Sequence, residues 1–257
     1  MDVLRKELNA FYESQNLDSA TLDYSILARC RRMVDDAVEV ESDCRVITDA
    51  AADFCYIAGG RFSHLIGLSD EPSYHKEMDS SDEDDIYNRM HPEDLVDKRM
   101  LEHEFFKFID TLPAERKLDY KATCRLRIKD RDGRYVMAGN STRALRLSPE
   151  GKVWLILCCY DLSPLQEPAG GIDARILDCA TGESRVPCIS ERRAHILTER
   201  EKEILNLIKE GRLSKQIADV LGISVHTVSR HRQNILEKLS VGNSVEAVMA
   251  ATLMRLL

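Results

Sequence analysis

The strongest constraint on the fold lies in residues 214–239, which read SKQIADVLGISVHTVSRHRQNILEKL. The stretch holds two segments with apolar side chains at helical spacing, namely Ile217 and Leu221 in the first and Val228, Ile235 and Leu239 in the second. Gly222 lies between them and permits a tight turn, while Ala218 is small where two helices joined by such a turn approach closely. This order predicts the helix-turn-helix arrangement.

Two more helices flank this pair in the sequence. Thr198 and Glu201 have the spacing of a capping box, which predicts the start of an amphipathic helix at that point. Residues 244–257 are apolar on more than one face and predict a last helix. The caps expected for the two central helices are Ser214 and Ser224. Residues 194–257 are therefore expected to form an all-α, four-helix domain.

The second helix of a helix-turn-helix pair fits the major groove of DNA and reads base edges with its N-terminal half. If Val228 and Ile235 face inward, the outward side chains are Val225, His226, Ser229, Arg230 and Gln233. Arginine pairs with guanine, glutamine pairs with adenine, and valine can touch a thymine methyl group. We expect backbone phosphates to be contacted from the flanks and from helix N-termini, by Lys215, Gln216, Ser224, Thr227, Arg232 and Asn234.

Residues 197–248 resemble the LuxR/GerE-type DNA-binding domain. The matching positions are Leu197, Thr198, Arg200, Glu201, Lys215, Ile217, Ala218, Leu221, Ile223, Ser224, Thr227, Val228, His231, Asn234, Ile235, Lys238, Leu239 and Val241. The resemblance implies a four-helix fold, a third helix in the major groove of double-stranded DNA, a homodimer joined through the fourth helix, and RNA polymerase as a candidate partner. Ser229 and Ser244 stand where the family often has a basic residue.

The charge of the chain is divided between two regions. Residues 190–257 hold 11 Lys and Arg against 8 Asp and Glu, whereas the first 189 residues hold 25 against 36. The net charge of −8 therefore belongs to the front of the chain, and the mildly basic end permits a polyanionic partner. The longest uncharged apolar run, residues 153–160, is too short to cross a bilayer, and the first residues lack a signal-peptide pattern. We expect a cytoplasmic protein with no membrane partner.

The front of the chain divides into a helical segment (residues 1–47) and a region with strand periodicity (48–165). In the latter, residues 53–67 predict a hairpin turning at Gly59 and Gly60, an irregular or helical middle follows, and 118–163 predict a three-stranded meander. This order resembles a PAS domain, which implies a five-stranded antiparallel sheet and short helices around a small cavity. Residues 166–193, rich in proline and glycine, predict a linker with a short ordered piece at 173–180. The fold class expected is α+β.

Apolar residues of the strand-like runs are expected to pack the core, or alternatively to line a pocket for a small apolar ligand. They are Phe54, Tyr56, Leu126, Ile128, Val136, Met137, Trp154 and Ile156. No pattern of histidines or carboxylates suits a metal or haem, no motif supports a flavin at Cys55, and the eight cysteines contain no CxxC pair. We expect no catalytic residues, no metal and no cofactor, and leave open a ligand of unknown identity.

These observations predict a transcriptional regulator rather than an enzyme. The PAS-like domain is expected to sense a signal or partner and to control a dimeric DNA reader. The alternative is a signalling adaptor whose helical end binds protein without sequence-specific DNA binding. The salt dependence of nucleic-acid binding separates the two, because phosphate contacts release counterions.

Overall fold

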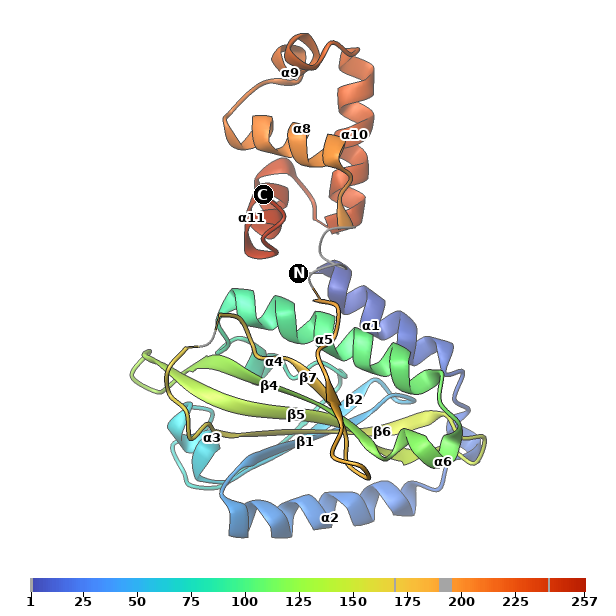
Figure 1. Ribbon diagram of the computed structural model, residues 1–257. Coiled ribbons are helices and arrows are strands. Elements are labelled where there is room, and N and C mark those ends of the chain that lie inside the picture. Colours follow the sequence, from blue (N-terminus) through green and yellow to red (C-terminus); the bar gives the residue numbers. More distant parts are fainter. Residues whose placement is uncertain (1, 169, 190–195, 240) are drawn as a thin grey trace. The chain divides into compact units, whose positions relative to one another are not determined.

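The structure, a computed structural model, describes residues 2–168, 170–189, 196–239 and 241–257 (Figure 1). The chain forms two compact units. One is a sheet domain of residues 8–187, and the other is a helical domain of residues 188–257 together with the first seven residues. The fold class is α+β, as predicted. None of the described helices is long and apolar enough to span a bilayer.

The sheet domain contains helices and strands in mixed order. The helices are α1 (Asp2–Ser14), whose second half belongs to this domain, the short 3₁₀ helix η1 (Ser19–Thr21), α2 (Tyr24–Glu41), α3 (Arg61–Leu65), α4 (Asp84–Tyr87), α5 (Pro92–Asp110) and α6 (Ala114–Lys117). The strands are β1 (Cys44–Asp49), β2 (Phe54–Gly59), β3 (Tyr74–Met78), β4 (Tyr120–Lys129), β5 (Tyr135–Leu147), β6 (Val153–Leu162), β7 (Arg175–Asp178) and β8 (Ser184–Arg185).

The strands form one antiparallel sheet in the order β3-β2-β1-β6-β5-β4-β7-β8. The prediction of five strands is therefore wrong, since the sheet has eight. The middle five, β2-β1-β6-β5-β4, include the predicted meander, and the additions lie at both edges. The added strand β3 is mostly exposed and lacks apolar alternation, while β7 and β8 are short, so their sequences carry weak strand signals.

The predicted hairpin of residues 53–67 is also wrong. The hairpin partner of β2 is β1, and the chain enters helix α3 directly after Gly60. A Cβ atom on Gly60 would lie 2.7 Å from the carbonyl oxygen of Val38 at the end of α2, and the Gly60 N–H donates to the Asp43 carbonyl at 2.7 Å. Glycine is thus required here by a close passage of two backbones rather than by a hairpin turn.

Three strands of the sheet begin inside segments that the sequence pattern assigns to a helical segment or a linker. Strand β1 begins at Cys44, inside the expected helical segment of residues 1–47. Strands β7 and β8 lie inside the expected linker, where β7 pairs with β4 and β8 pairs with β7. The ordered piece anticipated at 173–180 is therefore a strand of the sheet, and the sheet domain reaches Pro187. Residues 190–193 of the expected linker lie outside the described residues.

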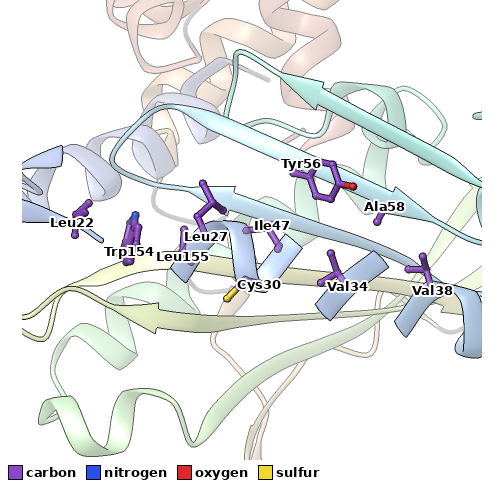
Figure 2. Packing of buried hydrophobic residues seen from close by; sticks show 10 residues of the cluster. All are labelled: Leu22, Leu27, Cys30, Val34, Val38, Ile47, Tyr56, Ala58, Trp154 and Leu155. Atoms are coloured by element: carbon purple, nitrogen blue, oxygen red, sulfur yellow. The ribbon is translucent and has the colours of Figure 1, made fainter. Parts of the chain in front are cut away.

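Helix α2 covers one face of the sheet, and α5 covers the other (Figure 1). The apolar residues of α2 recur at helical spacing and meet the strands in the cluster shown in Figure 2, formed by Leu22, Leu27, Cys30, Val34, Val38, Ile47, Tyr56, Ala58, Trp154 and Leu155. The indole N–H of Trp154 donates to Asp49 at 3.1 Å, which satisfies the one polar atom of that buried ring. Burial of this apolar face attaches α2 to the sheet.

On the opposite face, α5 is held at its start and along its length. His91 is the N-cap and Pro92 occupies the first helical turn. The Asp94 carboxylate accepts a hydrogen bond from the backbone N–H of Arg127 at 2.7 Å, which ties α5 to β4. Further along, Phe106 is fully buried and stacks on Phe11 of α1 with ring centroids 5.4 Å apart. The second half of α1 therefore packs on the α5 side of the domain.

In the helical domain, the described residues 196–239 and 241–257 form four helices, as predicted. They are α8 (Glu199–Lys209), α9 (Ser214–Leu221), α10 (Val225–Leu239) and α11 (Ser244–Leu253). Helix α10 contacts the other three. Its predicted inward residues Val228, Ile235 and Leu239 are at most 1% exposed. The predicted capping box is present: Thr198 Oγ1 accepts from the Glu201 N–H at 3.3 Å, and Glu201 Oε2 accepts from the Thr198 N–H at 2.8 Å.

Glu201 has a second role that links two helices. The same Oε2 atom accepts a hydrogen bond from Lys238 Nζ of α10 at 2.7 Å, and the Glu201 side chain is 3% exposed. Burial alone would raise the pKa of Glu201, but the Lys238 ammonium and the Thr198 N–H outweigh it and hold that pKa below its usual range. The ionised carboxylate therefore fixes the start of α8 against the end of α10.

The α2 cluster should dominate the stability of the sheet domain. Leu27→Ala removes a side chain that is 8% exposed in this cluster and is expected to lower the free energy of unfolding by about 2–5 kcal/mol. Met33→Ala on the same helix, at a residue 51% exposed, should change it by less than about 0.5 kcal/mol. Urea unfolding followed by the fluorescence of Trp154, the single tryptophan, measures both. Equal effects of the two substitutions would contradict this packing.

Glu201→Gln should destabilise the helical domain by about 1–3 kcal/mol at neutral pH, because it removes the charge that binds Lys238 inside the domain. Since the pKa of Glu201 is lowered on folding, its contribution is complete above the unfolded pKa and is lost as pH falls through the folded value. Calorimetric unfolding of the full chain should therefore show a difference at pH 7 that vanishes at strongly acidic pH. The matched control is Glu203→Gln, whose side chain is 56% exposed.

Candidate nucleic-acid interface

The turn between α9 and α10 has the geometry that its residues predict. Gly222 adopts the left-handed conformation, with φ of 62°, and its N–H donates to the Ala218 carbonyl. Ala218 is 5% exposed, and the two helices contact each other. The guanidinium of Arg200 on α8 donates to the Leu221 carbonyl at 3.0 Å, so a charged donor satisfies one of the last carbonyls of α9. The turn is thus held by a backbone hydrogen bond within α9 and by a side-chain hydrogen bond from α8.

Ser224 caps α10 as predicted. Its Oγ accepts from the Thr227 N–H at 3.0 Å, and its carbonyl accepts from the Val228 N–H at 3.1 Å. The two hydroxyls of Ser224 and Thr227 lie 2.8 Å apart. Ser224 is exposed and Thr227 is half-buried, so this first turn of α10 presents polar groups at the surface.

Burial of Val228 and Ile235 sets the outward face of α10. All five residues expected on that face are exposed: Val225, His226, Ser229, Arg230 and Gln233. Within the part of the chain that the structure describes, Arg230 makes no ion pair, so its guanidinium is available to a ligand. Gln233 Nε2 donates to Glu237 one turn later at 3.0 Å, which leaves its carbonyl oxygen exposed as an acceptor.

The residues expected on the flanks divide into two groups. Lys215 and Gln216 are exposed at the start of α9, and Asn234 is half-buried. Gln216 Oε1 accepts from the Leu213 N–H at 2.9 Å, so Gln216 caps α9 and Leu213 is the N-cap residue. The expectation that Ser214 is this cap is therefore wrong. Ser214 is the first helical residue, and its hydroxyl has another partner.

That partner is Arg232, which connects three helices. Its Nη1 donates to Ser214 Oγ of α9 at 3.0 Å, and its Nη2 donates to Ser244 Oγ of α11 at 2.8 Å. Both acceptors are neutral hydroxyls, so the positive charge of Arg232 is hydrogen-bonded without being neutralised by them. The sequence pattern places Arg232 on the flank of α10, but it carries no signal that two serines far apart in the chain converge on one guanidinium.

An open hollow of about 500 Å³ lies beside Arg232, lined by Ser214, Ser229, Arg232, Gln233, Leu236, Asn243, Ser244 and Val245. Both positions at which the chain departs from the family's usual basic residues, 229 and 244, line this hollow. The small serine side chains therefore leave open a groove between α10 and the start of α11. Asn243 Oδ1 caps α11 by accepting from the N–H groups of Val245 and Glu246 at 3.1 and 3.0 Å.

In the sheet domain, most of the apolar residues expected in the core are buried. Tyr56, Leu126, Ile128, Met137, Trp154 and Ile156 are at most 6% exposed, whereas Phe54 and Val136 are half-buried. Tyr56 and Trp154 belong to the cluster beneath α2. Sequence reasoning did not anticipate the many charged side chains buried on the α5 side, because helix α5 has no clean amphipathic pattern that would place them outside or inside.

Comparisons with known proteins agree with this geometry in the helical domain. Residues 195–251 match the family described as bacterial regulatory proteins, luxR family. The chain is 39% identical over 79 residues to the uncharacterized response regulatory protein YgeK of Escherichia coli, which covers 31% of this chain and 50% of YgeK. It is 47% identical over 55 residues to the transcriptional regulatory protein DesR of Bacillus subtilis, covering 21% of this chain and 28% of DesR.

Among solved structures, the chain is similar to a phage VqmA in complex with DPO, with 20% identity over 88% of this chain and 87% of the other. The TM-score of that superposition is only 0.30, so it adds nothing to the description of the fold. The chain spans half or less of the length of the two curated relatives named above. The family match, the turn at Gly222 and the exposed face of α10 together identify the C-terminal domain as a luxR-family helix-turn-helix domain.

Proposed function

We propose that the chain is a cytoplasmic, DNA-binding transcriptional regulator in which the sheet domain senses a signal and controls a luxR-family reader. The observation that carries the proposal is the outward face of α10, where Arg230 and Gln233 stand exposed above a fully buried stripe. The family match of residues 195–251 and the relatives named as transcriptional regulators support the same function.

In this proposal α10 enters the major groove of double-stranded DNA. Arg230 and Gln233 contact base edges, Val225 reaches a thymine methyl, and His226 and Ser229 border the same bases. Phosphates are held from the start of α9 and the first turn of α10, by Lys215, Gln216, Ser224, Thr227 and Asn234. A homodimer would place two such helices on two half-sites of a near-palindrome. The exposed side chains Val245 and Met249 on α11 offer apolar surface for that dimer.

The sensing role rests on the organisation of the sheet domain. Its chain order is a hairpin (β1 and β2), a set of short helices with α5, and a meander (β4 to β6), which is the order on which the PAS resemblance depends. We propose that this part is a PAS-like domain extended by three further strands, β3, β7 and β8. The adaptor alternative would be favoured if DNA binding by the purified chain did not weaken with salt.

Arg230→Ala and Gln233→Ala should each weaken specific DNA binding by about 1–3 kcal/mol, or roughly 10- to 100-fold in Kd, because each removes a paired contact to a base edge. The measurement is a mobility shift with a duplex that the wild-type chain selects from a random-sequence pool. Lys209→Ala, which removes an exposed cation on α8, is the matched control and should have little effect. The assignment of the reading face fails if both variants bind that duplex as tightly as wild type.

Arg232 is expected to position α10 rather than to neutralise a phosphate, because both ends of its guanidinium are already occupied by Ser214 and Ser244. Removing those acceptors with Ser214→Ala and Ser244→Ala should therefore weaken DNA binding although no charge is lost. Arg232→Gln should weaken it further while leaving the slope of log Kd against log salt unchanged. A phosphate contact predicts the opposite pattern, in which the serine variants are silent and the Arg232→Gln slope falls by about one.

A further inference from the structure

The α5 side of the sheet domain contains an unusual group of buried charges. We call it the interior polar cluster and define it as Glu83, Tyr87, Lys98, Arg99, Glu102 and Tyr160. Lys98 is 0% exposed, Glu83 is 1% exposed, Glu102 is 3% exposed and Arg99 is 5% exposed. Charged side chains are almost never buried to this degree unless they are paired.

Most members of the cluster bind one another. Lys98 Nζ lies 2.5 Å from Glu102 Oε1 and donates to the Tyr87 hydroxyl at 3.2 Å. The Tyr160 hydroxyl of β6 donates to Glu83 Oε2 at 2.5 Å. Arg99 Nη2 pairs with Asp82 at 3.0 Å, and the Thr142 hydroxyl of β5 donates to Glu102 Oε1 at 3.3 Å. The cluster thus joins α5, the segment before α4 and the inner face of the sheet.

Two side chains of the cluster retain free hydrogen-bonding capacity. Among the described residues, Arg99 Nε and Nη1 and Glu102 Oε2 are buried atoms without a partner. Each such atom destabilises the fold, and apolar side chains of similar volume usually replace a buried ion pair at no loss of stability. The stability of the fold therefore does not explain why Arg99 and Glu102 are buried with unpaired atoms. Recognition of a ligand by those atoms would explain it.

A surface hollow lies beside the segment that carries Asp82 and Glu83. This hollow measures about 500 Å³ and has Tyr12, Asp53 and Ser81 in its lining. Ser81 forms part of its wall and is followed directly by Asp82 and Glu83, which lead into the cluster. Asp53 Oδ1 accepts from the Ser81 N–H at 2.8 Å and fixes that wall.

Tyr12 of α1 relates the hollow to the cluster electrostatically. It lines the hollow, and its pKa is raised well above the usual value, first by burial and next by the negative charge of Glu102. A ligand that enters the cluster from this hollow would require Tyr12, or the second half of α1, to move.

The unused atoms define the chemistry of the molecule that fits. Glu102 Oε2 requires a donor, and Arg99 Nε and Nη1 require acceptors. Residues three apart on a helix have Cβ atoms about 5–6 Å apart, so the donor and the acceptor must be close together in a small molecule. Lys98 offsets Glu102, Asp82 offsets Arg99, and burial raises the pKa of Glu83 and favours its neutral form. With this balance, a ligand with net charge would leave that charge uncompensated inside the domain.

We propose that the interior polar cluster recognises a small zwitterion of the α-amino-acid class, whose amine donates to Glu102 and whose carboxylate accepts from Arg99. The molecule enters through the hollow beside Tyr12. This inference rests on the proposed sensing role, because it names the class of signal that the sheet domain binds. It is distinct from DNA recognition, which belongs to the helical domain.

The test uses the full chain, dialysed and titrated calorimetrically with glycine, L-alanine, L-serine and L-threonine, and in a second arm with uncharged acetamide. At least one amino acid should bind saturably at one site per chain. Glu102→Gln should weaken it by about tenfold or more, because it replaces a buried charge-assisted acceptor. Glu104→Gln, on the same helix but outside the cluster, should leave binding unchanged.

Tyr12→Ala provides a second variant that leaves the cluster intact, and stopped-flow measurements should show faster association than in wild type. The proposal is overturned if no probe binds, if acetamide alone binds, or if Glu102→Gln binds amino acids as well as Glu104→Gln does. A mobility shift with and without the bound amino acid separates the two levels of inference. Binding without any effect on DNA would retain the site and overturn the sensing role.

Discussion

The buried stripe of Val228, Ile235 and Leu239 on α10 is the constraint on which the DNA-facing surface depends. A helix has one orientation in which these three side chains leave water together, and burying each contributes on the order of 1.5–3 kcal/mol. Once they are inside, the helical period places positions 226, 229, 230 and 233 outside. The basic character of this face is therefore a consequence of packing, in a chain whose overall charge is acidic.

The apolar stripe alone still allows α10 to rotate and slide slightly against its neighbours. Polar contacts restrict these movements. Lys238 binds the capping carboxylate of α8, and Arg232 binds hydroxyls at the starts of α9 and α11. Each of these contacts joins a charged side chain to the end of another helix, where backbone groups already need partners. A reader that must present two or three side chains to base edges gains from such restraint, since a small rotation of α10 would misplace them all.

The helical domain could be predicted almost completely from the sequence, because its signals are local: the Thr198 capping box, the Ser224 cap, the glycine turn and a clear helical period. The errors there concern long-range contacts, since Ser214 reads as a cap but binds Arg232, 18 residues away. In the sheet domain the central strands β4 to β6 alternate clearly and were predicted. Strands β3 and β8 are not predictable in this way, because edge strands need only one hydrogen-bonded neighbour and need bury little apolar surface. Strand β7 pairs on both sides, but its four residues are too few to show an alternating pattern.

The two faces of the sheet differ in how many charged side chains they bury. The face under α2 is sealed by an apolar cluster around Trp154, in which the one buried indole N–H is satisfied by Asp49. The face under α5 carries ion pairs in which Arg99 Nε and Nη1 and Glu102 Oε2 have no partner within the described residues. Among the described residues Asp49 Oδ2 is also buried without a partner, but the rest of the α2 cluster is apolar. Apolar packing favours a single rigid arrangement, whereas a partly satisfied polar network is stabilised by any molecule that completes it. The α2 face is thus suited to hold the fold, and the α5 face is suited to respond to what binds.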